Sequence, residues 1–105
     1  MLTLPIKKKW FDMIVSGEKK EEYREFKEYY HIRFKRIFGL DYRDKSAEIV
    51  FRNGYNYNSP TVRCLCTLEV GTGKKEWGAN PNEKYYKLII LRVLEVRKWV
   101  IFQKK

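Results

Sequence analysis

The sequence predicts a small α+β domain in which several curved strands and two main helices form a compact mixed β-barrel. Apolar residues recur at helical spacing in two segments of the first 40 residues, and patterns typical of strands dominate after residue 45. At 105 residues the chain is long enough for one hydrophobic core, so we expect a single domain over residues 1–105. Its hydrophobic content of 44% argues against a disordered chain.

The N-terminal segment is predicted to form a strand followed by a helix. Alternating apolar residues indicate a strand over residues 2–6. Helical spacing predicts a helix that ends at Ser16-Gly17, with an apolar face made of Trp10, Phe11, Ile14 and Val15. Three lysines, Lys7, Lys8 and Lys9, stand at its start, where the helix dipole disfavours cations. They are either solvated side chains or part of an anion site on the helix amides.

A second amphipathic helix is expected over residues 26–38, and Gly39 should end it. Its apolar stripe consists of Tyr30, Phe34, Ile37 and Phe38. Its other side is basic and carries Lys27, Arg33, Lys35 and Arg36. Helix faces of this kind are usually solvated, and contact with phosphates is the alternative.

After residue 45 the pattern predicts strands over residues 47–51, 61–70 and 84–96, the last with a bulge or bend, and a final strand over residues 99–102. Cys64 and Cys66 point to one face of a strand about 7 Å apart, too far for an easy disulfide. We interpret them as small core residues. These two cysteines and the single His31 do not have the spacing of a zinc site, so no metal or cofactor is predicted.

The net charge of +10 is distributed along the chain. Residues 1–45 hold 12 basic and 8 acidic side chains, and the remaining residues hold 11 and 5. Such a surface attracts polyanions, above all nucleic acid, but it also serves solubility. No apolar run approaches the roughly 18 residues of a membrane span. The N-terminal order, apolar and then basic, is the reverse of a signal peptide, so we expect a cytoplasmic protein without a membrane partner.

Opposite charges crowd directly after the first helix, in the segment Gly17-Glu18-Lys19-Lys20-Glu21-Glu22-Tyr23-Arg24. A strand over residues 19–24 would place Glu22 and Arg24 on one face with Lys20, and Lys19 on the other. Whichever face turns inward carries a carboxylate and a cation. A buried charge must be paired and hydrogen-bonded, so the cluster is either a structural ion pair or a ligand site.

Two loops carry groups that suit a planar, hydrogen-bonding ligand such as a nucleobase. The first combines Arg52 and Asn53 with the aromatic ring of Tyr55. The second, residues 71–78, lacks the third glycine of a dinucleotide-binding motif and is followed by a proline where a helix should run. We expect this loop to present Glu76 and Trp77 at a barrel rim, with the tryptophan either stacked on a base or folded over the barrel end.

These patterns resemble the ASCH domain family, whose members have a PUA-like β-barrel. The resemblance covers nearly the whole chain and is carried by the first strand and helix, by Gly17-x-Lys19-x-x-Glu22-x-Arg24, by Arg52-Asn53-Gly54-Tyr55, and by residues 71–79 with Tyr85-Tyr86. The combination of the first motif with the later Glu-Trp-Gly-Ala loop is more specific than the first motif alone. This combination of motifs resembles a small bacterial and phage branch of the family.

The resemblance implies a cleft beside the barrel, lined by Lys19, Glu22 and Arg24, for RNA or nucleotide-like ligands. Some relatives are acetylcytidine amidohydrolases that use a lysine and a threonine in this motif, with a glutamate from elsewhere. Lys19 matches the lysine, but Glu22 stands at the threonine position, so the nucleophile is missing. Ribonuclease activity has been attributed to other relatives, and no residue of this chain discriminates it.

Three hypotheses remain open. The first is an RNA- or nucleoside-binding domain whose ligand contacts come from Lys7, Lys19, Glu22, Arg24, Arg52, Asn53, Tyr55, Glu76 and Trp77. The second is a hydrolase of the same pocket, with Lys19 as a base whose proton affinity is reduced by its surroundings and Glu22 or Glu76 assisting. The third is a protein-interaction module in which Lys19, Glu22 and Arg24 form only a structural ion pair.

Overall fold

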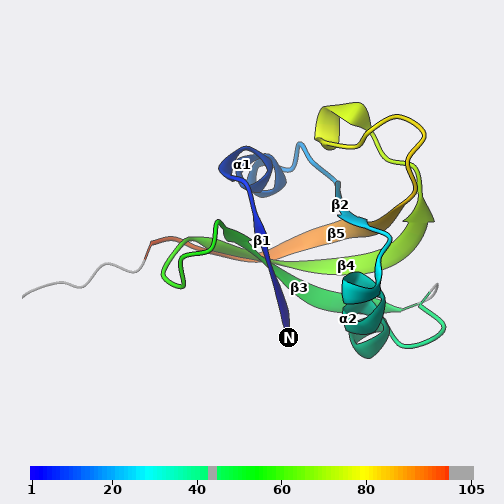
Figure 1. Cartoon of the computed structure of the whole chain (residues 1–105). Helices are drawn as coiled ribbons and strands as arrows, with labels where there is room; N and C mark the ends of the chain where they lie inside the picture. Colours follow the sequence, from blue (N-terminus) through cyan, green and yellow to red (C-terminus); the bar gives the residue numbers. More distant parts are fainter. Residues whose placement is uncertain (43–44, 100–105) are drawn as a thin grey trace, which may run out of the picture.

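The structure, a computed structural model, describes residues 1–42 and 45–99 (Figure 1). In this part of the chain, five strands form one sheet: β1 (Leu2–Ile6), β2 (Glu21–Glu25), β3 (Ser46–Asn53), β4 (Thr61–Gly71) and β5 (Tyr85–Arg97). The helical segments are α1 (Lys8–Ser16), α2 (Glu28–Phe38) and the 3-10 helix η1 (Lys75–Trp77). The predicted α+β class with two main helices is therefore confirmed.

The sheet has the spatial order β1-β3-β4-β5-β2 and curls into a half-barrel (Figure 1). β1 runs parallel to β3, and all other neighbouring strands are antiparallel. The two edge strands, β1 and β2, are the segments on either side of α1 in the sequence. They approach each other through a side chain, because Arg24 Nη2 of β2 donates a hydrogen bond of 2.9 Å to the Pro5 carbonyl of β1. The half-barrel thus has a seam between β1 and β2.

The bulge or bend expected near residues 84–96 is confirmed in β5. The pairing of β4 with β5 shifts register twice, between Arg63 and Cys64 and between Leu65 and Cys66. At these shifts Leu91 and Leu94 of β5 have no residue opposite them in β4. An extra residue in one strand bends that strand and increases the local twist, which favours a curled sheet.

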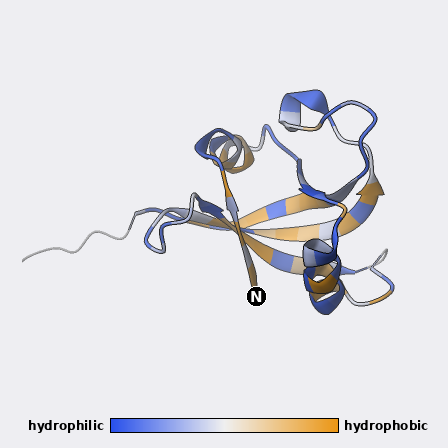
Figure 2. Ribbon diagram, viewed as in Figure 1, coloured by the Kyte–Doolittle hydropathy of each residue, from blue (hydrophilic) through white to orange (hydrophobic). Residues whose placement is uncertain are grey.

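One hydrophobic core fills the inner face of the sheet, and both α-helices contribute to it (Figure 2). The buried residues of α1 are Phe11 and Ile14, and those of α2 are Phe34 and Phe38. Cys64 and Cys66 are fully buried free thiols, as the alternation of β4 predicted. Val15, assigned to the apolar face of the first helix, is not part of the core and is 38% exposed.

The other differences from prediction concern the ends of elements. β2 begins at Glu21 and not at residue 19, and α2 begins at Glu28 instead of residue 26. Gly39 ends α2 as expected, with a φ of 85° that favours glycine. Trp99 follows the end of β5 and is exposed, and residues 100–102 of the predicted final strand lie outside the described residues. No helix among residues 1–42 and 45–99 is long and apolar enough to cross a membrane.

Because its thiols are buried, the protein should lose stability as the pH rises in the alkaline range. Burial raises the pKa of Cys64 from 9.0 to about 11. Below pH 9 the folded and unfolded states both keep the proton, whereas between pH 9 and 11 only the unfolded chain releases it. The free energy of unfolding should therefore fall over this range, with about 2–3 kcal/mol due to this thiol.

Urea unfolding at several pH values, compared between the wild type and Cys64→Ala, measures this contribution. The variant loses packing at every pH, but its stability should depend less on pH above 9. Equal pH dependence in the two proteins would show that the thiol is not responsible.

Candidate functional site

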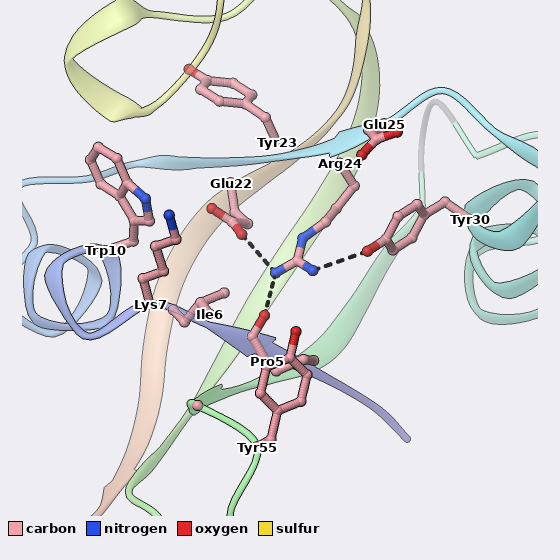
Figure 3. Close-up of a pocket in the computed structure, with 11 residues that line it drawn as sticks. Pro5, Ile6, Lys7, Trp10, Glu22, Tyr23, Arg24, Glu25, Tyr30 and Tyr55 are labelled. Atoms are coloured by element: carbon pink, nitrogen blue, oxygen red, sulfur yellow. Dashed lines mark hydrogen bonds and ion pairs between the residues drawn. The ribbon is translucent and has the colours of Figure 1, made fainter.

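A cavity of about 420 Å³ opens at the seam between the edge strands β1 and β2 (Figure 3). β1 and the start of α1 contribute Pro5, Ile6, Lys7 and Trp10. β2 contributes Glu22, Tyr23, Arg24 and Glu25. Tyr30 of α2 and the loop residues Gly54 and Tyr55 complete the lining. The volume lies in the range of small-molecule sites in proteins, which is about 300–1,000 Å³.

Arg24 connects three elements around this cavity. Its Nη2 donates to Glu22 Oε2 at 2.7 Å and to the Pro5 carbonyl at 2.9 Å, and its Nη1 donates to the Tyr30 hydroxyl at 3.1 Å (Figure 3). Burial would lower the pKa of Arg24, but the Glu22 carboxylate and the Tyr30 hydroxyl more than offset it, so this pKa lies above its ordinary value. The guanidinium therefore stays charged and holds β2 against β1 and α2. Its Nε is buried without a hydrogen-bond partner.

Lys19 reaches the same cluster from the turn after α1. Gly17 ends α1 with a φ of 84°, and the Lys19 amide donates to the Met13 carbonyl at 2.9 Å. This turn directs the Lys19 side chain inward, where it is fully buried. The amine donates to the Trp77 carbonyl at 2.5 Å and lies 3.3 Å from Glu22 Oε1. Burial lowers the pKa of Lys19, although the Glu22 carboxylate acts in the opposite direction.

The predicted arrangement of faces around Lys19 was wrong. Glu22 and Arg24 do share a face, but Lys19 joins them and Lys20 is exposed. The reason is that residues 18–20 form the connection between α1 and β2, so the alternation of a strand does not apply to them. Lys20 still contributes its carbonyl, which accepts a hydrogen bond from the Ile90 amide at 2.9 Å.

Two aromatic rings lie next to the Lys19 amine, and one of them also packs against the loop that carries η1. The ammonium lies 4.9 Å from the Trp10 ring centroid and 5.0 Å from that of Tyr23. Trp10 also packs on Gly78, where an added Cβ would lie 3.0 Å from the ring. Gly78 has a φ of 101°, so both its conformation and this close approach favour glycine. The contact between Trp10 and Gly78 holds the loop so that the Trp77 carbonyl accepts the hydrogen bond from the Lys19 amine.

Glu22 is the common partner of both cations. One carboxylate oxygen faces Lys19 and the other accepts from Arg24, and the side chain is 9% exposed. Each carboxylate oxygen has two acceptor sites, so capacity remains on the side that faces the cavity. The cavity therefore presents a hydrogen-bond acceptor next to the Arg24 guanidinium, with the rings of Trp10 and Tyr55 nearby (Figure 3). Such a set of groups suits a flat ligand with both donor and acceptor atoms.

The structure brings together only part of the predicted site. Lys7, Glu22, Arg24 and Tyr55 line the cavity, whereas Lys19 supports Glu22 from behind and is not part of the lining. The prediction missed Trp10 and Tyr30, which were assigned to the apolar faces of helices. The only sequence signal for a site role of Trp10 was its position beside Lys7 to Lys9. For Tyr30 it was the position in the basic second helix.

The remaining predicted residues do not line the cavity. Arg52 is at the end of β3, with its guanidinium 5.6 Å from the Tyr57 ring. Asn53 pairs with Ile6 in the sheet, and its amide donates to the Pro60 carbonyl. Glu76 is exposed on η1, and Trp77 is half-buried and contributes its carbonyl to Lys19.

Comparisons of the chain with protein-family models, with curated proteins and with solved structures found no match. What the site can bind must therefore be inferred from the residues of this chain alone. Within residues 1–42 and 45–99, no group of three or more His, Cys, Asp and Glu side chains is arranged to hold a metal ion.

Replacing Glu22 by Gln should strongly destabilise the protein. The variant leaves Lys19 and Arg24 buried without a counter-charge, which costs about 3–5 kcal/mol. Urea unfolding measures the loss, and Glu18→Gln is the matched control because Glu18 is exposed in the same segment. A loss no greater than that of the control would show that the fold does not depend on this carboxylate.

Gly73 and Gly71 provide a second matched pair. A Cβ at Gly73 would lie 2.5 Å from Tyr23 Cζ and 2.8 Å from the Ala79 Cβ, whereas at Gly71 its nearest neighbour is Lys87 Cδ at 3.7 Å. Gly73→Ala should therefore displace the Tyr23 ring and cost about 1–3 kcal/mol, while Gly71→Ala should change stability little. Thermal unfolding of both variants tests this difference. If the two variants melt together, the loop is not packed against Tyr23.

Proposed function

We propose that this chain is an ASCH-type domain with a PUA-like barrel that binds RNA or a nucleoside-like ligand in the cavity at the β1–β2 seam. The observation that carries the proposal is the pairing of Glu22 with Arg24 on the cavity wall, 2.7 Å apart, beside aromatic rings. The curled five-stranded sheet supports the resemblance to a PUA-like barrel. The first-choice ligand residues are Glu22 and Arg24, with Trp10 and Tyr55 as the flat surfaces.

A nucleobase has the properties that this cavity can recognise. Its edge carries hydrogen-bond donors and acceptors side by side, and the cavity offers a carboxylate and a guanidinium in adjacent positions. Its faces stack on aromatic side chains, and Trp10 and Tyr55 both line the cavity. The net charge of +10 would attract a nucleic acid to the protein.

The hydrolase alternative stays a prediction without a specific observation in its favour. A general base must come within hydrogen-bond reach of the atom that loses its proton. The Lys19 amine instead faces the Trp77 carbonyl and Glu22, on the far side of the cavity wall. Incubation with acetylcytidine and with labelled RNA, followed by mass analysis, would reveal turnover. The protein-interaction alternative shares the structural ion pair but assigns no role to the cavity.

Ligand binding should change the environment of Trp10 and not that of Trp99, which lies beyond β5 and is exposed. Titration with the four ribonucleosides and with a mixed-sequence ribohexanucleotide, followed through the indole N–H signals by NMR, checks this. We expect a saturable shift of the Trp10 signal with at least one of these ligands. Signals that stay unchanged at millimolar ligand would contradict the proposal.

A further inference from the structure

We infer that the ligand is a single strand of RNA and not a free nucleoside: one base enters the cavity, and the strand continues over Lys7 and Tyr55 at its rim. This inference rests on the proposed function and specifies its ligand. It is argued from three features: the paired charges of the cavity wall, the lysines beside the cavity, and the exposed aromatic loop at its rim.

Among the cations that line the cavity, only Lys7 is not paired with a carboxylate within the described residues. Two cations, Lys7 and Arg24, and two carboxylates, Glu22 and Glu25, are among the residues that line it. Arg24 is committed to Glu22, and Glu25 lies 3.6 Å from the Lys27 amine. A phosphate placed against Glu22 and Arg24 would meet a carboxylate and a guanidinium that is already paired, whereas a neutral base would meet an acceptor and a donor there. The wall formed by Glu22 and Arg24 is therefore suited to a base and not to a phosphate, which would instead pair with Lys7.

Free positive charge lies instead at the edge of the cavity. Lys7, Lys8 and Lys9 are all exposed at the start of α1, whose first turn contains no acidic residue. Lys8 is paired with Asp12 at 2.6 Å, but Lys7 forms no ion pair with any residue that the structure describes. The Lys9 amine lies 4.7 Å from the Trp10 ring, which itself lines the cavity. Lys7 and Lys9 are thus placed to contact phosphates next to a bound base.

The loop between β3 and β4 presents aromatic rings at the same rim. Tyr55 is 89% exposed although it lines the cavity, and Tyr57 in the same loop is 83% exposed. The loop is ordered by its backbone, because the Gly54 amide donates to the Ile6 carbonyl at 2.9 Å and the Ser59 amide to the Asn56 carbonyl at 3.0 Å. Rings held outward on an ordered loop are platforms on which unpaired bases stack.

A free nucleoside would use only the cavity and would leave these lysines and the outer ring faces without a role. A nucleic-acid strand uses all three, because its successive phosphates and bases lie next to the inserted base. Duplex RNA keeps its bases paired and stacked. Placing one of these bases in the cavity would cost the free energy of unpairing and unstacking that base. The three features together select an unpaired strand.

The test compares a fluorescein-labelled mixed-sequence ribohexanucleotide, the four ribonucleosides and a short RNA duplex, all with the full chain. We expect the hexanucleotide to bind at least tenfold more tightly than any nucleoside or the duplex. Its affinity should fall as salt rises from about 50 to about 200 mM, because phosphate contacts release counterions. Nucleoside binding should be nearly independent of salt.

Two variants and one control, all at exposed positions, test the path of the strand without disturbing the fold. Lys7→Gln should lower the slope of log affinity against log salt by about 0.7, the value for one phosphate contact on a single strand. Lys35→Gln, which removes the same charge from an exposed position on α2, should leave the slope unchanged. Tyr55→Ala should weaken hexanucleotide binding roughly 5- to 150-fold.

Each failure has a distinct meaning. Nucleosides that bind as tightly as the hexanucleotide would overturn the inference and leave the proposed function standing. A duplex that binds equally well, or equal effects of Lys7→Gln and Lys35→Gln, would also overturn it. If neither nucleosides nor the hexanucleotide bind, both the inference and the proposed function fail.

Discussion

The carboxylate of Glu22 is the shared counter-charge of two buried cations, and the organisation of the seam depends on this interaction. Through Lys19 it is connected to the Trp77 carbonyl of η1, and through Arg24 to β1 and α2. A buried charge without a partner costs several kcal/mol, so neither cation is tolerable in its place without the carboxylate. A single acidic side chain therefore determines how the segments at the seam sit relative to one another.

The same cluster explains why a cavity exists. Strands joined by a backbone ladder lie about 4.8 Å apart and leave no room between them. β1 and β2 are instead bridged by the guanidinium of Arg24, which spans a wider gap. A structural ion pair and a ligand site are therefore not exclusive alternatives here, because the side chains that close the half-barrel also form the cavity wall.

Features encoded in local patterns could be predicted from the sequence, and features that depend on distant contacts could not. The alternation of β4 and the apolar stripe of α2 follow from periodicity alone. The position of Lys19 depends on the turn at Gly17 and on the Trp77 carbonyl, 58 residues away in the chain. Trp10 was assigned to the apolar face of the first helix because a half-buried aromatic ring on a helix has the same sequence pattern as a buried one.

The choice of lysine at position 19 is itself an argument for a binding role. Buried ion pairs are often replaced by apolar residues of similar volume without loss of stability, so stability alone does not require this amine. Glu22 would still have Arg24 as a counter-charge if residue 19 were apolar. What the amine adds is a second fixed contact, which holds one carboxylate oxygen and so determines the direction of the remaining acceptor sites. Under the proposed function, a carboxylate oriented from both sides is pre-organised for the ligand, at the cost of burying a cation whose pKa is lowered by its surroundings.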